Sequence, residues 1–156
     1  KDDINKLIQN SNFKNKINFI NKAADVKNSE KKLFGLVEDD RGNKSEGASI
    51  LREHNSNLYR SNDKLSTTVQ TFDFIEKLKE LKEYDNVIIK MDIEGAEYDI
   101  LEKLLRNLNH IKNIKHLFVE FHTRFFDKDK KKIFFQRENI IKNELRNKKL
   151  DYTSWI

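Results

Sequence analysis

Apolar residues in the second half of the chain alternate between two periodicities. Short, nearly continuous apolar runs at 87–91 and 114–121 predict strands that are covered on both faces. Apolar residues recur at helical spacing over 96–108 and 128–148, and a further strand begins at 150–156. Strands that alternate with helices in this way are typical of an α/β protein with a largely parallel sheet.

The first half of the chain has weaker patterns. Apolar residues at helical spacing predict a short amphipathic helix over 2–12. Thr71 is the candidate N-cap of a second helix, which carries Phe74 and Leu78 on one face. The remaining expectations are strands at 16–25, 32–39 and, at a sheet edge, 67–71; a turn at 40–43; and a polar, acceptor-facing loop over 44–66 with a short strand or helix near 48–51.

The length and composition fit one domain. The chain has 156 residues and 11 Phe, enough for one core, and no linker-like stretch divides it, so we expect a single domain over 1–156. The net charge is +5, but the Lys residues are interleaved with Asp and Glu, and we expect no nucleic-acid partner. Pro is absent while Asn, Lys and Ile are abundant, a bias typical of an AT-rich coding genome.

Several classes of site and location are disfavoured. The chain has no Cys, which excludes a disulfide framework, a thiolate zinc site and a cysteine nucleophile. No apolar run approaches the ~20 residues that span a bilayer. The first residues, Lys1-Asp2-Asp3, do not resemble a signal peptide. We therefore expect an intracellular, cytoplasmic location.

Acidic residues cluster where the first apolar strand ends. Asp92, Glu94 and Glu97 follow that strand, and Gly95 lets the backbone turn into the next helix. Ligands of open α/β sheets bind outside the carboxyl ends of strands. Asp92 is therefore a candidate to accept hydrogen bonds from a ligand, to act as a base or to bind a cation, or it stabilises the turn. Glu97 is either functional or a carboxylate that favours the helix N-terminus.

A second polar pair ends the next strand. Glu120 and His122 share one face of this strand, because residues two apart in a strand point to the same side. If the two strands are adjacent, His122 lies near Asp92 and Glu94. His122 is then a candidate general base with a raised pKa, or it helps to bind a divalent metal, or it is a surface residue.

The other charged residues near these strands receive structural interpretations. Lys90 interrupts an apolar run, and we expect it to form a salt bridge with Glu120. His54, His110 and His116 have no partners at metal-ligand spacing, and we expect them on the surface. The sequence assigns no metal site.

These residues resemble a known family. Residues 87–101, Val-Ile-Ile-Lys-Met-Asp-Ile-Glu-Gly-Ala-Glu-Tyr-Asp-Ile-Leu, are very similar to the hallmark of FkbM-type S-adenosylmethionine-dependent methyltransferases, where the stretch forms the fourth strand of the class I methyltransferase sheet and its following helix. Residues 117–122 resemble the fifth strand. Residues 67–74 resemble the family's threonine-leucine-aspartate segment, with Phe72 in place of the usual Leu. Residues 18–25 resemble the third strand, whose end borders the adenine ring.

The resemblance covers residues 4–150 and implies a fold, a cofactor and a reaction. The fold is a Rossmann-like class I methyltransferase fold, a mostly parallel sheet with flanking helices. The cofactor is S-adenosylmethionine, and the reaction is O-methylation of a hydroxyl on a sugar, a glycan or a small molecule. By position, Ala23, Ala24 and Asp25 would flank the adenine of the donor.

The same resemblance gives roles to the strand-end residues. Asp92 would lie at the junction of donor and acceptor, in contact with the cofactor, and Glu94 and His122 would face the acceptor. Methyl transfer to a hydroxyl requires alignment of the two substrates and can require removal of the hydroxyl proton. Either His122 or Asp92 is the base.

The chain departs from the family pattern at the donor site. Class I methyltransferases hold the donor with a Gly-rich loop, whereas this chain has only four Gly and no G-x-G-like loop. We therefore expect that the first two strands are missing, that the last strand is cut short at Ile156, and that the chain binds donor weakly or not at all by itself.

Two other functions remain open. One is a degenerate, non-catalytic binding module with a methyltransferase fold. The other, weaker reading is a metal-dependent hydrolase that uses Asp92, Glu94 and His122, although the chain lacks a second His or Asp cluster at usable spacing. The sequence does not indicate the oligomeric state.

Overall fold

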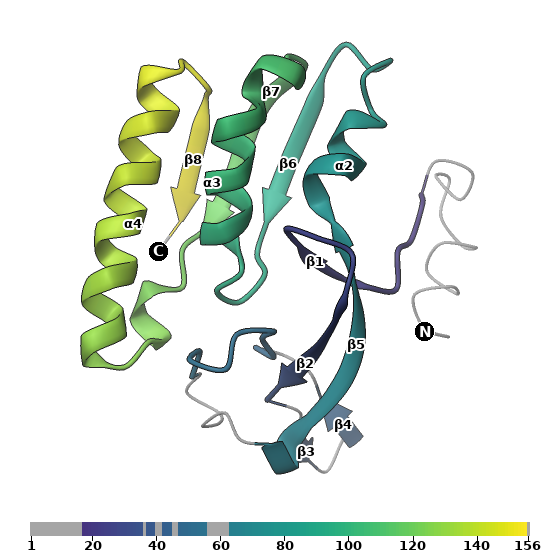
Figure 1. Cartoon of the computed structure of the whole chain (residues 1–156), viewed down its shortest axis with the longest axis vertical. Helices are drawn as coiled ribbons and strands as arrows, with labels where there is room; N and C mark the ends of the chain where they lie inside the picture. The colour runs from purple at the N-terminus through teal and green to yellow at the C-terminus, as the bar shows by residue number, and fades with distance from the viewer. Residues whose placement is uncertain (1–16, 36, 40–41, 45–46, 56–62, 156) are drawn as a thin grey trace.

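The computed structural model describes residues 17–35, 37–39, 42–44, 47–55 and 63–155. The predicted helix at 2–12 lies outside the described residues. In these ranges the chain is a mixed α/β protein with a parallel sheet of three strands, a second sheet of three strands and a short hairpin (Figure 1).

The parallel sheet contains the strands predicted in the second half of the chain. It has the order β6-β7-β8, with β6 at Val87–Met91, β7 at Ile114–Glu120 and β8 at Tyr152–Trp155. The connections contain α3, Glu97–Asn107, and α4, Lys128–Asn147. The short 3-10 helices Leu108–His110 and Thr123–Phe125 complete them. The predicted order of strands and helices is confirmed here.

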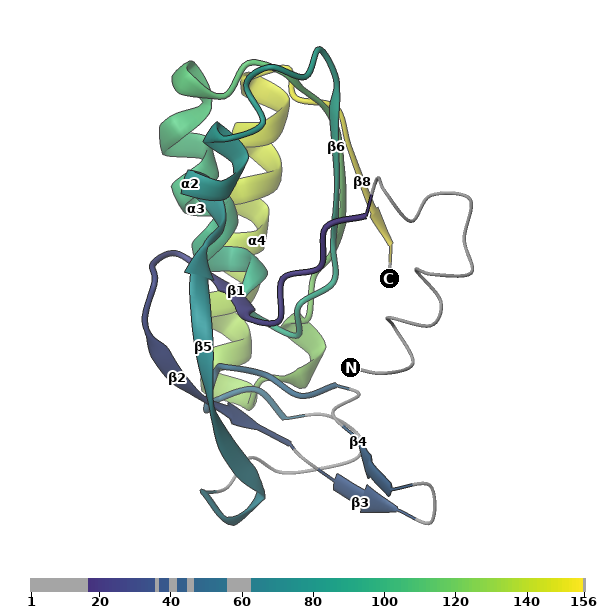
Figure 2. The same cartoon turned by 90° about the vertical axis from the view of Figure 1, so that its right-hand side faces the viewer.

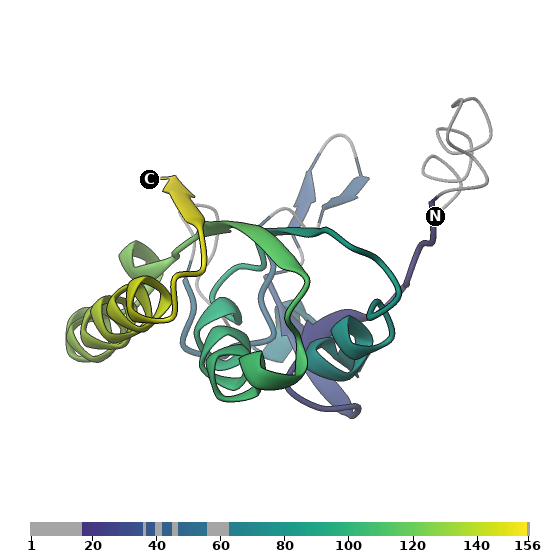
Figure 3. The same ribbon diagram turned by 90° about the horizontal axis from the view of Figure 1, so that it is seen from above.

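The helices cover one face of this sheet. Figures 2 and 3 show α3 and α4 on the same side of β6, β7 and β8. Leu101 and Leu104 of α3, Leu117 of β7 and Ile141 of α4 are fully buried in one core. Burial of each such side chain stabilises the fold by roughly 1.5–3 kcal/mol. The apolar positions at helical spacing therefore form this interface.

The opposite face of the sheet is more exposed, so the prediction that these strands are covered on both faces is wrong. Ile88 is 67% exposed and Phe118 is 37% exposed. Lys90 also points to this face, where its Nζ lies 5.4 Å from the centre of the Trp155 ring. The predicted salt bridge between Lys90 and Glu120 is wrong, because Lys90 lies over an aromatic ring and Glu120 binds other partners.

The second sheet corrects several expectations for the first half of the chain. Its order is β1-β5-β2, in which β1 is parallel and β2 antiparallel to β5. The predicted edge strand at 67–71 is therefore the central strand of this sheet. The strands are β1, Ala23–Asp25, β2, Glu30–Phe34, and β5, Ser66–Asp73.

Two predicted strands are shorter than expected. The strand predicted over 16–25 is limited to β1, and residues 17–22 are not in a strand. The strand predicted over 32–39 is divided into β2 and β3, Val37–Asp39, because Gly35 has a φ of 88°, outside the extended region. The hairpin partner of β3 is β4, Gly42–Lys44. The antiparallel pairs confine the parallel arrangement to part of the molecule.

The helix after β5 begins two residues later than predicted. The N-cap of α2, Phe74–Lys79, is Asp73, whose Oδ1 accepts hydrogen bonds from the backbone N–H groups of Ile75 and Glu76. Thr71 lies within β5, and its hydroxyl donates to the carbonyl of Lys27 at 2.8 Å. Both residues are good N-caps, and the helix begins after Asp73 because the pairing of β5 with β1 continues to that residue.

The described part of 44–66 contains little regular structure. Ser49 forms an isolated bridge with Phe34, and His54 forms one with Phe126. The expected short element near 48–51 is limited to this single bridge. The 3-10 helix Asp63–Leu65 precedes β5. None of the helices in the described ranges is both long enough and apolar enough to cross a bilayer.

Candidate functional site

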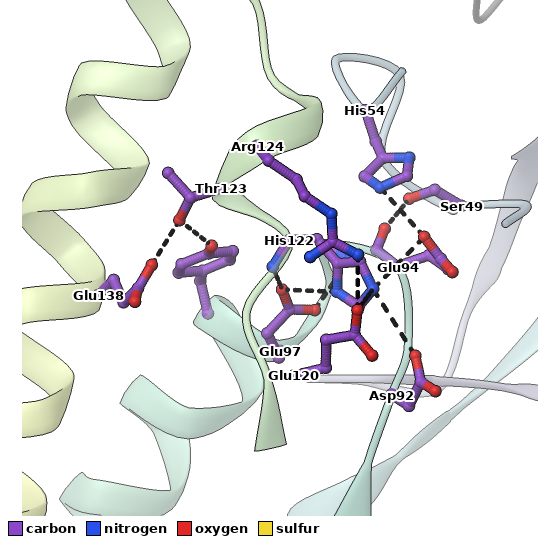
Figure 4. Close-up of polar contacts among 12 residues, drawn as sticks. Ser49, His54, Asp92, Glu94, Glu97, Glu120, His122, Thr123, Arg124 and Glu138 are labelled. Atoms are coloured by element: carbon purple, nitrogen blue, oxygen red, sulfur yellow. Dashed lines mark hydrogen bonds and ion pairs between the residues drawn. The ribbon is translucent and has the colours of Figure 1, made fainter. Parts of the chain in front are cut away.

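The carboxyl ends of β6 and β7 lie side by side. The register pairs Met91 with Val119, so the residues that follow each strand leave the sheet at one edge. This places Asp92 and Glu94 beside His122, as predicted (Figure 4). The adjacency follows from the parallel strand–helix–strand unit that the sequence indicates.

A left-handed turn connects β6 to α3. Glu94 has a φ of 52° and Gly95 a φ of 101°. A Cβ atom on Gly95 would meet side-chain atoms of His54, Leu51 and Phe126 at 3.2–3.3 Å. The hydroxyl of Ser49 donates to the carbonyl of Glu94 at 2.5 Å. The turn is therefore held from outside, as an unfavourable backbone conformation at a non-glycine residue requires.

Glu97 connects the two strand ends. Its side chain is fully buried. Its Oε2 accepts the backbone N–H of Gly95 at 2.8 Å, and its Oε1 accepts the backbone N–H of His122 at 2.8 Å. The Nδ1 of His122 lies 3.2 Å from the same Oε1. Glu97 thus fixes the position of the His122 ring as well as the turn.

His122 is surrounded by carboxylates. The side chain is 1% exposed, and its Nε2 lies 3.5 Å from Glu94 Oε2, 3.6 Å from Asp92 Oδ1 and 3.6 Å from Glu120 Oε1. Burial opposes the charged imidazole, but the hydrogen bond to Glu97 and the charges of the nearby carboxylates outweigh it and raise the pKa of His122. The predicted raised pKa is thus supported by the geometry.

His54 belongs to this cluster and is not a surface residue. It is fully buried, and its Nε2 lies 3.3 Å from Glu94 Oε2. The close contact with His54 is the main cause that lowers the pKa of Glu94, with help from the charges of His122 and Arg124 and against burial. The prediction that His54 is exposed is wrong, because the bridge to Phe126 brings its segment against the strand end.

Glu120 has two further partners. Its Oε1 accepts from Arg124 at 2.6 Å, and its Oε2 accepts from the indole N–H of Trp155 at 2.8 Å. The first bond ties the end of β7 to the 3-10 helix that follows, and the second ties it to β8. Glu120 is therefore held in a fixed orientation beside His122.

A pocket of about 460 Å³ opens next to this cluster. Asp92 and Glu94 line one side of it, and Ala23 and Ala24 of β1 line another. Asp92 is 42% exposed and is the member of the cluster most open to it. All four alanines of the chain line the pocket: Ala23, Ala24, Ala48 and Ala96.

The small side chains of these alanines account for the open volume of the pocket. Alanine methyl groups leave room that larger residues would fill, and Gly47 lines the same pocket. A pocket of this size is within the range of sites for small molecules and cofactors. Carboxylates on one wall and small apolar groups on the other can bind a ligand that is polar at one end.

One residue predicted at the donor site lies elsewhere. Asp25 is 2% exposed and does not line the pocket, and its Oδ2 forms an ion pair with Lys31 at 2.8 Å. Its side chain is therefore engaged by the protein, whereas the neighbouring Ala23 and Ala24 are open to the pocket.

The structure also identifies a set of possible metal ligands. One ligand atom from each of Asp92, Glu120 and His122 lies within 4.8 Å of the others. Two of these residues are buried and one is exposed, so an ion could reach them from the pocket side. The sequence pattern offered Asp92 and His122 as possible metal ligands, with Glu94 and not Glu120 as the third residue, and it assigned no metal site.

Comparison with known proteins supplies the family. The family model described as the methyltransferase FkbM domain matches residues 4–150. Neither curated proteins nor solved structures give a significant match. The matched range contains both strand ends and the pocket. The chain therefore belongs to the FkbM methyltransferase family.

Proposed function

We propose that the chain is an S-adenosylmethionine-dependent methyltransferase of Rossmann-like class I fold that methylates a hydroxyl group of a sugar, a glycan or a small molecule. The observation that carries this proposal is the pocket, which is lined by β1 residues on one side and by the Asp92–Glu94 turn on the other. β1 pairs with β5 and not with β6 in the described ranges. This fits the class I order, in which other strands separate the third strand from the fourth.

The lining of the pocket fits the parts of the donor. Ala23 and Ala24 present small apolar groups that can flank a flat adenine ring. Asp92 lies across the pocket and can accept hydrogen bonds from the donor's ammonium or ribose hydroxyl groups. Asp25 does not line the pocket and its carboxylate binds Lys31, so we assign it no contact with the donor.

The cluster behind the pocket fits proton removal from an acceptor. When bound, the donor supplies a methyl group to an attacking oxygen. Asp92 is the exposed carboxylate at the rim and is placed to accept the hydroxyl proton. His122 is buried behind Asp92, with its Nε2 3.6 Å from Oδ1, and its charge can stabilise that carboxylate; Glu94 completes the acceptor side of the pocket.

Calorimetric titration of S-adenosylmethionine into the chain tests the donor site. A tyrosine at Ala24 would fill the pocket, so Ala24→Tyr should abolish donor binding. Thr68→Tyr is the matched control, since Thr68 is an exposed residue of β5 in the same sheet. Because the chain has no G-x-G-like loop, we expect weak binding, and the titration should extend to millimolar donor.

The outcomes separate the enzyme from the binding module. Donor binding that Ala24→Tyr abolishes, followed by release of S-adenosylhomocysteine with a hydroxylated acceptor, supports the enzyme. Binding that Ala24→Tyr leaves intact, or none at millimolar donor, contradicts the proposed pocket. Micromolar binding would instead refute the expectation of weak binding that follows from the absence of a G-x-G-like loop.

A further inference from the structure

We propose that Asp92, Glu120 and His122 bind a divalent metal ion at the carboxyl ends of β6 and β7. The ligand atoms of the three residues lie within 4.8 Å of one another, and Nε2 of His122 is 3.6 Å from both carboxylates. Ligands about 2.1 Å from one ion lie roughly 3 to 4 Å apart, so small side-chain movements would complete this set.

One buried polar atom at the centre of the cluster lacks a hydrogen bond. The Oε2 of Glu94 has no hydrogen-bond partner among the described residues, although the Nε2 atoms of His54 and His122 lie 3.3 Å and 3.5 Å away. Buried polar atoms normally have such partners, and a bound ion would supply the missing interaction.

The Nδ1 side of the His122 ring has the hydrogen-bond partner that a metal-binding histidine needs. Glu97 is fully buried and lies 3.2 Å from Nδ1, so it can accept the proton of that nitrogen. The lone pair of the neutral ring is then on Nε2, which faces Asp92 and Glu120 (Figure 4). A carboxylate behind a histidine in this way is the usual arrangement at metal sites.

The charges around Nε2 also fit a divalent ion. Asp92, Glu94 and Glu120 face this atom with three carboxylates, while Arg124 brings one positive charge through Glu120. Glu97 adds a fourth carboxylate at Nδ1, which leaves an excess of negative charges around the ring. A divalent ion would neutralise them, and carboxylates this close would otherwise repel each other.

The ligand set favours a first-row transition metal. Two carboxylates and one imidazole form a mixed oxygen and nitrogen set, whereas Ca²⁺ and Mg²⁺ prefer oxygen alone. Three protein ligands leave coordination positions open toward the pocket, where Asp92 is exposed. A role for these positions in holding the acceptor oxygen rests on the proposed function, whereas metal binding itself does not.

Manganese binding to the full chain tests the site. We expect EDTA-treated protein without donor to bind one Mn²⁺ per chain, measured by loss of the free-ion signal in electron paramagnetic resonance. Asp92→Asn should weaken binding at least tenfold, a loss that even indirect support residues produce at metal sites. Glu83→Gln, which changes a carboxylate that is 82% exposed, is the matched control and should bind as the unchanged protein does.

The midpoint temperature of thermal unfolding, compared with and without Mn²⁺ for each variant, provides a second measurement. Mn²⁺ should raise the unfolding temperature of the unchanged protein and of Glu83→Gln, but not that of Asp92→Asn. Absence of binding at millimolar Mn²⁺, or equal binding by Asp92→Asn, would overturn the inference. Ala24→Tyr should leave Mn²⁺ binding unchanged, so failure of the metal site is distinguishable from failure of the donor pocket.

Discussion

Replacing Glu97 with glutamine tests whether this carboxyl group joins the two strand ends. Its Oε2 accepts one backbone N–H from Gly95, and its Oε1 accepts the backbone N–H of His122 with Nδ1 nearby. A glutamine amide keeps one oxygen, and its nitrogen cannot accept a hydrogen bond. At least one buried N–H therefore loses its partner in Glu97→Gln.

The loss of stability in Glu97→Gln follows from these hydrogen bonds. A buried N–H left without a partner costs about 1–3 kcal/mol, and loss of the charge from the remaining bonds adds roughly 1 kcal/mol. We therefore expect Glu97→Gln to lower the free energy of unfolding by about 2–4 kcal/mol. With a urea m-value of about 2 kcal/mol/M, the midpoint should fall by about 1–2 M.

Urea denaturation followed by circular dichroism and by the fluorescence of Trp155 measures this change. The control is Asp99→Asn on the same helix, whose carboxylate is 44% exposed and pairs with Arg137 at 2.5 Å. Exposed ion pairs contribute about 0–1 kcal/mol, so the control should lose little. A loss below about 1 kcal/mol in Glu97→Gln, or one equal to the control, would refute this account of the site.

Three other variants test neighbouring parts of the structure. Ser49→Ala should lower the free energy of unfolding by about 1–2 kcal/mol, because the buried hydroxyl of Ser49 donates to the turn after β6. The control Ser66→Ala removes an exposed hydrogen bond and should change the free energy of unfolding by less than about 0.5 kcal/mol. Equal losses for the two variants in urea denaturation would contradict this prediction. Asp73→Asn keeps an N-cap but loses the ion pair with Lys103, which helps to lower the pKa of Asp73 against burial. The unchanged protein should therefore be more stable than Asp73→Asn above about pH 4, which is the pKa of Asp73 in the unfolded chain. This difference in stability should disappear as the pH falls through the lower pKa that Asp73 has in the folded chain. A difference that persists at pH 2 would contradict the prediction. His122→Asn should lower the rate of methyl transfer about tenfold or more with donor binding unchanged, because the ring lies beside the Asp92 carboxylate that accepts the proton. An unchanged rate would contradict a role for the ring in the reaction.

The sequence predicts the second half of the fold because its signals are local. Val87–Met91 is an apolar strand pattern that only Lys90 interrupts, and α4 carries its apolar residues at helical spacing along about five turns. In the first half, the strands are short and their pairing partners are distant in sequence. Thr71 and Asp73 are equally good N-caps by residue type, and only the pairing of β5 with β1 decides between them.

The sequence likewise predicts only part of the candidate site. The meeting of Asp92 with His122 follows from two adjacent parallel strands, which a strand–helix–strand pattern indicates. His54 has no such signal, because it lies in a segment without periodicity and reaches the site through one bridge to Phe126. Glu97 carried a weak signal, its place two residues after a turn glycine, but only its buried contacts separate it from an ordinary first-turn carboxylate.

The four alanines around the pocket also bear on how this sequence changes over generations. A genome with AT-rich codons favours Lys, Asn and Ile and disfavours Ala, whose codons begin with GC, and this chain follows that bias elsewhere. The four alanines of this chain, Ala23, Ala24, Ala48 and Ala96, nevertheless all border one space. A mutation to a bulkier residue at any of these four positions would reduce the volume that is open to a ligand.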